Sequence, residues 1–115
     1  QVKKAAQHAI QQYCGMGLVT CRFTHIYPDG PAPYFTILAK GEKGKQLEQW
    51  DGIKQEVSEA IIKNGGTITH HHAVCKDHRP YYSQQHSPIF GDILKASKKT
   101  VDPNWILNPG VLIQE

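Results

Sequence analysis

The first part of the chain changes from a helical to an extended hydrophobic pattern. Residues 2–13 are good helix formers with apolar side chains at helical spacing, and two glycines end the pattern. Residues 17–27 alternate apolar and polar side chains as a half-buried strand does, and residues 34–39 alternate again after the turn-rich segment 28–33. The pattern predicts one helix followed by two antiparallel strands joined by a loop.

The second part predicts two more helices and one more strand. A polar loop at 41–45 leads into an amphipathic helix that ends near Asn64, and residues 67–72 favour a third strand. Ser87 followed by Pro88 is a typical helix start, and an irregular tail follows that helix. The expected buried faces are Trp50, Ile53, Val57, Ala60 and Ile61 on the second helix and Phe90, Leu94, Ser97 and Val101 on the third.

The order helix, strand, strand, helix, strand, helix indicates an α+β fold of one domain. One further strand in front of residue 1 would complete a β-α-β-β-α-β unit, so we expect a ferredoxin-like fragment whose first strand is missing. Its antiparallel sheet should have the helices on one face. The side chains expected to point at the helices are Val19, Cys21, Phe23, Phe35, Ile37 and Ile68.

The other face of the predicted sheet is polar and contains titratable groups. By the two-residue period of a strand, this face should display Thr20, Arg22, Thr24, Tyr34, Thr36, Thr67, Thr69 and His71. Such a face is either a solvated surface, which is common in antiparallel sheets, or a surface that meets a ligand.

Composition narrows the class of protein. Basic residues exceed acidic ones by only three and are scattered along the chain, which disfavours a nucleic-acid-binding protein. Cys14, Cys21 and Cys75 form no CxxC pair and are typical of free thiols in a reducing compartment. No apolar run suits a membrane span and no signal peptide is visible, so we expect a soluble, cytoplasmic protein.

Three consecutive histidines at 70–72 allow three interpretations. On a strand His70 and His72 share a side, and Cys75 or His78 would complete a zinc site with them. His71 would instead share the face of Tyr34, where imidazole and phenol groups suit proton transfer. Histidines hydrogen-bonded at the end of a strand are the third interpretation.

Three segments together resemble a known family: "THIYPDGPAPYFTILA", "NGGTITHHHAVCKDHRPYY" and "VDPNWILNPGVLI". In this order they resemble the C-terminal end of FAD-linked oxidases of the vanillyl-alcohol-oxidase type. Within that family the chain looks most like the alkyldihydroxyacetonephosphate synthases and their bacterial relatives. The resemblance covers essentially all of residues 1–115, and the histidine triplet followed by Asn-Pro-Gly is its most specific part.

The resemblance implies that the chain is the C-terminal portion of a cap or substrate domain. FAD would be bound mainly by a domain not present in this chain, and that N-terminal FAD-binding domain would be its partner, so the fragment alone should be inactive. A synthase would exchange the acyl group of acyl-glycerone phosphate for an alkyl group, as in ether-lipid biosynthesis. The alternatives are an FAD-dependent 2-hydroxy-acid oxidase or dehydrogenase and, from another class, a small zinc-binding or interaction module.

The resemblance also implies roles for individual residues. Tyr34 matches the tyrosine thought to abstract the α-proton of the substrate, and the histidine triplet matches a segment near substrate and flavin. We therefore expect His71 and His72 to be catalytic, His70 and Asn108 to lie near the substrate or cofactor, and no metal ligand. Arg22 is a candidate for holding an anionic substrate group because of its predicted face.

Two further expectations concern departures and partners. The family usually has Gly where this chain has Cys75, and the synthases have Gly at Ala73, so we expect the backbone to differ just after the triplet. The substrate should be a small or lipid-like molecule, which is compatible with a protein at the membrane periphery. A homodimer is compatible with the resemblance, whereas a nucleic-acid partner is not expected.

Overall fold

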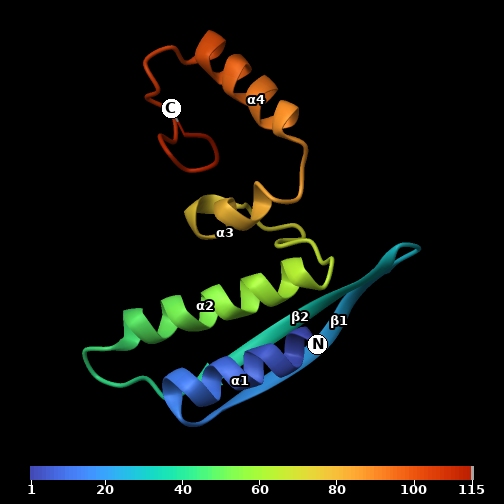
Figure 1. Cartoon of the computed structure of the whole chain (residues 1–115), viewed down its shortest axis with the longest axis vertical. Helices are drawn as coiled ribbons and strands as arrows, with labels where there is room; N and C mark the ends of the chain where they lie inside the picture. Colours follow the sequence, from blue (N-terminus) through green and yellow to red (C-terminus); the bar gives the residue numbers. More distant parts are fainter. Residues whose placement is uncertain (115) are drawn as a thin grey trace. The chain divides into compact units, whose positions relative to one another are not determined.

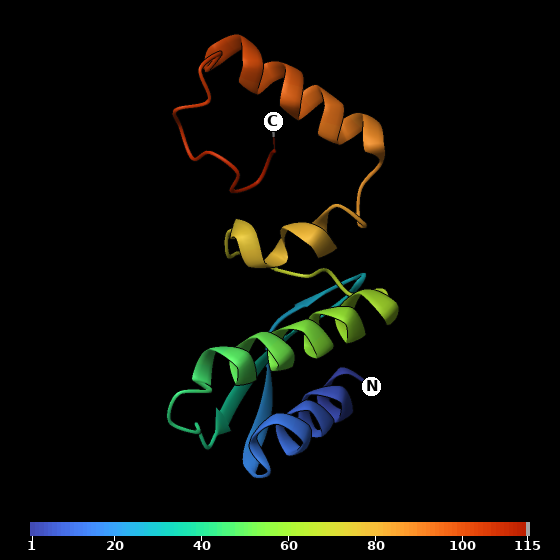
Figure 2. The same cartoon turned by 60° about the vertical axis from the view of Figure 1, so that its left-hand side comes forward.

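The computed structural model describes residues 1–114 and confirms an α+β fragment with an antiparallel sheet (Figures 1 and 2). The chain divides into two compact units, residues 1–64 and the residues from Gly65 onward. None of the helices among residues 1–114 is long and apolar enough to span a bilayer. The elements are α1 (Val2–Cys14), β1 (Gly17–Tyr27), β2 (Gly30–Ala39), α2 (Gln46–Lys63), α3 (Cys75–Tyr82) and α4 (Pro88–Val101).

A long hairpin forms the sheet of the first unit. β1 pairs with β2 from Gly17 opposite Ala39 to Tyr27 opposite Gly30, with an irregularity between Phe23 and His25. The predicted loop at 28–33 is therefore too long, because the strand already resumes at Gly30. Prolines had suggested a loop there, but a two-stranded ribbon leaves one edge of each strand unpaired, where proline is tolerated.

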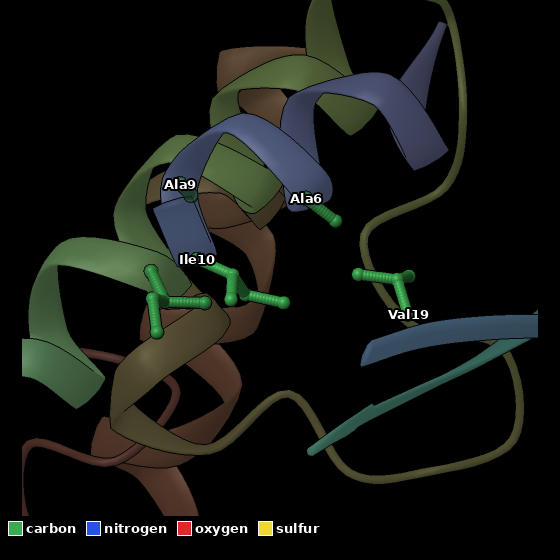
Figure 3. Close-up of a cluster of buried hydrophobic side chains, with 5 residues drawn as sticks. Ala6, Ala9, Ile10 and Val19 are labelled. Atoms are coloured by element: carbon green, nitrogen blue, oxygen red, sulfur yellow. The ribbon is translucent and has the colours of Figure 1, made fainter. Parts of the chain in front are cut away.

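Small side chains of α1 bring that helix close to the hairpin. Ala6, Ala9 and Ile10 are buried and form a core cluster with Val19 of β1 and Ile53 of α2 (Figure 3). Because alanines have short side chains, the helix axis can approach its neighbours closely, and the burial of the larger members stabilises the unit by roughly 25 cal/mol per Å² of apolar surface.

The predicted helix-facing side chains are covered only near one end of the hairpin. Phe35 and Ile37 pack against the core as expected. Cys21 and Phe23 are exposed, contrary to prediction, and Phe23 keeps 64% of its surface accessible. The turn end of the hairpin extends past the N-terminal end of α1, so that helix does not cover it (Figure 1).

Trp50 is also wrongly predicted. It was expected on the buried face of α2, but 56% of its surface is exposed and Lys54 lies over its ring at 5.6 Å. The buried position near it is Gln49, which is 8% exposed. Because the side-chain amide of Gln49 has hydrogen-bond partners inside, this polar residue occupies the place expected for an apolar one.

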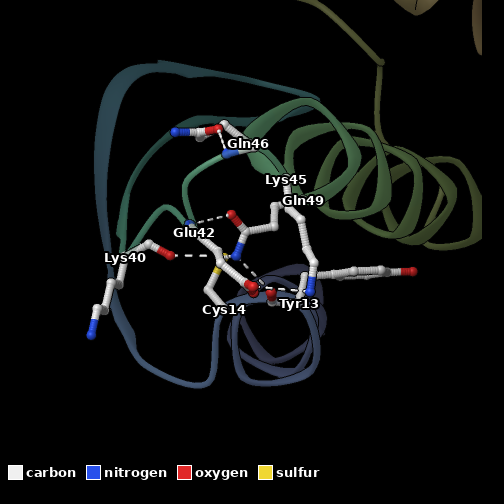
Figure 4. Close-up of polar contacts among 8 residues, drawn as sticks. Tyr13, Cys14, Lys40, Glu42, Lys45, Gln46 and Gln49 are labelled. Carbon is white, nitrogen blue, oxygen red and sulfur yellow. Dashed lines mark hydrogen bonds and ion pairs between the residues drawn. The ribbon is translucent and has the colours of Figure 1, made fainter.

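Gln49 connects three elements of the first unit through its amide (Figure 4). Its Nε2 donates to the carbonyl oxygen of Tyr13 at 2.8 Å, with Lys40 O and Cys14 Sγ each at 3.4 Å. Its Oε1 accepts from the N–H of Glu42 at 2.9 Å. One side chain therefore ties the end of α1 and the loop after β2 to α2.

The second unit lacks the predicted third strand. Residues 67–72 are bends and coil, and Ile68 is buried there with its N–H donating to Gln85 Oε1 at 3.0 Å. A strand needs a neighbour to satisfy its backbone groups, and the sheet among residues 1–114 consists of β1 and β2 alone. The β-branched pattern of residues 67–69 gave the prediction, and the missing neighbour explains why it is wrong.

The regular secondary structure of the second unit consists of the helices α3 and α4. The helix start at Ser87 and Pro88 is confirmed, but α3 was not predicted, since Pro80 lies inside it and proline usually ends a helix. The predicted buried face of α4 is only partly correct, because no element of its own unit packs along it. Leu94 is half-buried, whereas Phe90, Ser97 and Val101 are exposed, with Val101 at 81%.

Candidate functional site

The hairpin brings two predicted site residues into contact. Arg22 lies directly opposite Tyr34 in the β1–β2 register, just as Thr20 lies opposite Thr36. The guanidinium Cζ of Arg22 is 4.6 Å from the centroid of the Tyr34 ring, a cation–π geometry. Directly opposed residues share a face of the sheet, so the predicted common face of these four side chains is confirmed.

This pair remains accessible and chemically versatile. Both residues are exposed, and Tyr34 keeps 41% of its surface accessible. A cation over a ring face uses the guanidinium plane and leaves its five in-plane N–H donors available for a carboxylate or phosphate. The phenol hydroxyl is a donor and an acceptor. The arrangement therefore suits an anionic group held beside a hydroxyl that exchanges a proton.

The histidine triplet is not arranged as a strand would arrange it. The Nδ1 atoms of His70 and His71 lie 2.7 Å apart, and the rings of His71 and His72 have centroids 4.7 Å apart. The Thr69 hydroxyl donates to the carbonyl oxygen of His72 at 3.0 Å and closes a tight bend. Adjacent strand residues would point to opposite faces, so the separation of His71 from its neighbours was wrongly predicted.

Without a strand at 67–72, two predicted groupings of these histidines lose their geometric basis. A shared side for His70 and His72, proposed for zinc, no longer follows from the two-residue period. The shared sheet face of His71 and Tyr34 loses its basis for the same reason. The three imidazoles instead form one exposed cluster, and two of them share a short contact in which one ring donates and the other accepts.

Just after the triplet the backbone takes an unusual turn. Cys75, the first residue of α3, has φ of +54°, in the left-handed region that favours glycine. This is the position at which the sequence resemblance led us to expect a departure from glycine. The chain therefore keeps the backbone conformation that suits a glycine while placing an exposed cysteine there.

Asn108 lies in a second left-handed turn near the end of the chain. Its φ is +45°, and its carbonyl oxygen accepts from the N–H of Val111 at 3.3 Å. The side chain is exposed. Sequence reasoning did not identify the residues that hold this segment, which are Arg79, Lys98 and Asp102. The only signal available was an aspartate just before a proline, which is typical of a turn.

The loop before α2 contains the one glycine-rich helix start in the first unit, but several of its amides already have partners within the chain (Figure 4). Within residues 41–45, the N–H of Glu42 donates to Gln49 Oε1 and that of Gly44 to Gln46 Oε1, both at 2.9 Å. A phosphate cradle needs such amides directed at the ligand. This loop therefore does not suit the diphosphate of a dinucleotide cofactor.

The fold is a small α+β fragment, and its accessible polar side chains lie on a hairpin and in short turns. Residues 1–112 match the family of FAD linked oxidases, C-terminal domain, and the chain belongs to that family.

Similar proteins support this family assignment. The chain is 28% identical over 114 residues to alkyldihydroxyacetonephosphate synthase from Dictyostelium discoideum, with 96% of the chain and 19% of the relative covered. It is 35% identical over 98 residues to the synthase from Caenorhabditis elegans, covering 84% of the chain and 16% of that protein. It is 37% identical over 90 residues to glycolate oxidase subunit GlcD from Bacillus subtilis, covering 78% and 19%.

The chain thus spans less than a fifth of the length of these relatives. The family is FAD-linked, which supports an FAD-dependent enzyme at this coarse level. Family membership groups the chain with flavoenzymes and not with small zinc-binding modules.

Proposed function

We propose that this chain is the C-terminal part of the substrate domain of an FAD-dependent enzyme with alkyldihydroxyacetonephosphate synthase activity. In that reaction the bond between the glycerone carbon and the acyl carboxylate breaks, and a bond to the oxygen of a fatty alcohol forms. A fatty acid leaves and there is no net redox change. The domain would act together with an N-terminal FAD-binding domain of the same polypeptide.

The contact between Arg22 and Tyr34 is the observation that supports this proposal most. Acyl-glycerone phosphate has a dianionic phosphate and an acidic proton next to a carbonyl group. An exposed guanidinium beside an exposed phenol matches these two groups, one to bind the phosphate and one to take the proton. The similarity to two synthases over most of the chain agrees with this substrate.

The resemblance also gives roles in this reaction to the remaining predicted residues. His71 and His72 would move protons between substrate and solvent, since imidazole titrates near neutral pH. His70 and Asn108 would lie near substrate or cofactor and hold polar groups there. These roles follow from the resemblance, and the exposure of all four side chains is consistent with them.

We infer that this chain contributes to the reactive end of a flavin site and not to its phosphate end. The amides of Glu42 and Gly44 are occupied, whereas Arg22, Tyr34 and Asn108 are accessible polar groups. Bound FAD would supply the electron-accepting ring that this chemistry needs. In this arrangement the chain's own residues bind and orient the substrate and exchange its proton.

Replacing Tyr34 by Phe in the full-length enzyme tests the proposal. Loss of the hydroxyl should lower turnover on the order of a hundredfold, because a general base contributes roughly that much. Release of fatty acid and incorporation of labelled fatty alcohol measure the exchange. Tyr27→Phe is the matched control, because Tyr27 lies at the end of the same hairpin and is 44% exposed, close to the 41% of Tyr34.

The control should keep turnover within about twofold, since it removes a hydroxyl that has no assigned role. Equal turnover of Tyr34→Phe and wild type would remove Tyr34 from the mechanism. Equal losses in both variants would show a general effect of hairpin hydroxyls and would also contradict the assignment.

A second candidate is an FAD-dependent oxidase or dehydrogenase of 2-hydroxy acids. The similarity to a protein named glycolate oxidase subunit supports it, because glycolate is a 2-hydroxy acid. Arg22 would then bind the substrate carboxylate. Anaerobic mixing separates the two candidates: bleaching of the flavin by a 2-hydroxy acid supports the oxidase, and alkyl exchange on acyl-glycerone phosphate without an electron acceptor supports the synthase.

A further inference from the structure

A partly buried ion pair holds the segment that follows α4. Lys98 and Asp102 are joined by a salt bridge, with 15% and 7% of their side-chain surfaces exposed. Asp102 also accepts from the N–H groups of Ile106 and Leu107, both at 3.0 Å, while Lys98 donates to the carbonyl oxygen of Leu107 at 2.7 Å. Both charged groups therefore make main-chain contacts within residues 106–107.

The electrostatics of this pair favour its charged state. The hydrogen bond from Lys98 holds the pKa of Asp102 below its ordinary value, and the two main-chain donors add to this effect against the opposing influence of burial. The ammonium of Lys98 also lies 5.3 Å from the ring centroid of Trp105, a cation–π contact.

A third charged residue holds the segment from its other end. The guanidinium of Arg79, from α3, donates to the carbonyl oxygen of Gly110. Between these anchors lie Asn108 and Pro109, which are both exposed. Asn108 and Gly110 have φ of +45° and +65°, so both sit in the left-handed region. We call Arg79, Lys98 and Asp102 the clamp and residues 108–110 the NPG turn.

Fold stability is a weak explanation for this arrangement. A buried ion pair often contributes less than apolar residues of the same volume would, because both charges lose their hydration. The clamp contacts a segment without regular secondary structure, and its hydrogen bonds go to main-chain groups on both sides of one short turn. These contacts flank a turn with an exposed Asn108 at its tip, a pattern typical of functional turns held on a support.

We propose that Arg79, Lys98 and Asp102 are positioning residues that hold the NPG turn so that Asn108 meets the substrate or flavin in a productive geometry. This inference rests on the proposed function, which puts Asn108 near those groups. The three residues do not touch the reacting atoms in this arrangement. They act through the turn, by removing its conformational freedom before the substrate binds.

The test uses the full-length flavoenzyme and two variants at opposite ends of the clamp, Asp102→Asn and Arg79→Met. Amide hydrogen exchange across residues 105–111 should become at least about tenfold faster in each, because the turn opens locally. In the alkyl-exchange assay kcat should fall roughly tenfold or more while KM changes little, since misplaced groups slow the chemical step. Flavin content, read from visible absorption, should stay at the wild-type level.

Three further variants separate positioning from a general structural role. Arg79→Lys retains a donor for Gly110 and should restore both kcat and slow exchange. Asp92→Asn and Lys99→Met change the same residue types at exposed positions of α4, and they should leave exchange and kcat within about twofold of wild type. Loss of kcat in these controls would overturn the assignment.

Failure of this inference is distinct from failure of the proposed function. Unchanged exchange at residues 105–111 in both clamp variants would overturn the clamp, whatever the activity. Faster exchange with unchanged kcat would overturn its positioning role. A normal rate for Tyr34→Phe would instead overturn the proposed base and would leave the clamp result standing.

Discussion

Single residues show where the chain departs from simple sequence rules. Cys75 is a non-glycine residue with φ of +54° directly after the histidine triplet. A side chain in the left-handed region is strained by about 1–2 kcal/mol because its Cβ approaches the following carbonyl oxygen. Comparison with the family pattern indicated this position from sequence, but the sign of φ is known only from the structure.

Replacing Cys75 by Gly should stabilise the start of α3. Relief of the left-handed strain is worth about 1 kcal/mol, so amide exchange of α3 should slow roughly fivefold. Hydrogen exchange with mass spectrometry of residues 75–82 measures this. Cys75→Ala is the control, because it removes the thiol and keeps the strained Cβ, and its exchange should match the wild type. A slower rate in Cys75→Ala as well would mean that the thiol, and not the backbone, is responsible.

At the scale of elements, the positions of α1, α2 and α4 were predictable, α3 was not, and the buried faces were predicted less well than the positions. The starts or ends of α1, α2 and α4 follow from periodicity and from glycine, serine and proline signals. Whether a helix face is buried depends on which other elements pack against it. The two glycines inside helices, Gly52 and Gly91, show this difference. A Cβ at Gly52 would lie 2.4 Å from the ring of Tyr13, whereas a Cβ at Gly91 would meet its nearest atom, His86 Cε1, at 3.8 Å.

These two glycines should respond in opposite directions to the same substitution. Gly91→Ala should stabilise α4 by about 1 kcal/mol, because alanine is the better helix former and there is room for its methyl group. Gly52→Ala should destabilise the pairing of α1 with α2 by roughly 1–3 kcal/mol, because the Tyr13 ring must move out of a packed position. Amide exchange of each helix gives the sign, and a slower rate at α2 in Gly52→Ala would contradict this packing.

At the scale of the whole molecule, the apolar core is confined largely to one unit. Ala6, Ala9, Ile10, Val19 and Ile53 form one buried cluster in residues 1–64. In the second unit Ile68 is the buried apolar residue among those described, and the NPG turn is held by charged groups instead. The two units therefore rest on different interactions.

This difference predicts unequal stability within the 115-residue chain. Amides of α1 and of α2 around Ile53 should exchange at least about tenfold more slowly than those of α4, because local opening costs less where few apolar contacts are buried. Hydrogen exchange followed by mass spectrometry resolves the two units. Equal protection of α4 and α1 would show that the second unit is stabilised by more than the contacts described above.

Local features of the amino-acid order were sufficient for α1, α2 and α4, for two antiparallel strands and for the shared face of Arg22 and Tyr34, because the periods of 3.6 and 2 and the turn residues act over a few positions. Three features could be known only from the tertiary structure. They are the absence of a strand at 67–72, the clustering of the histidines, and the clamp on the NPG turn. A strand exists only if another strand supplies hydrogen bonds, and Arg79 meets Gly110 across 31 positions of sequence. Contacts between distant positions are made by tertiary packing, which local patterns do not specify.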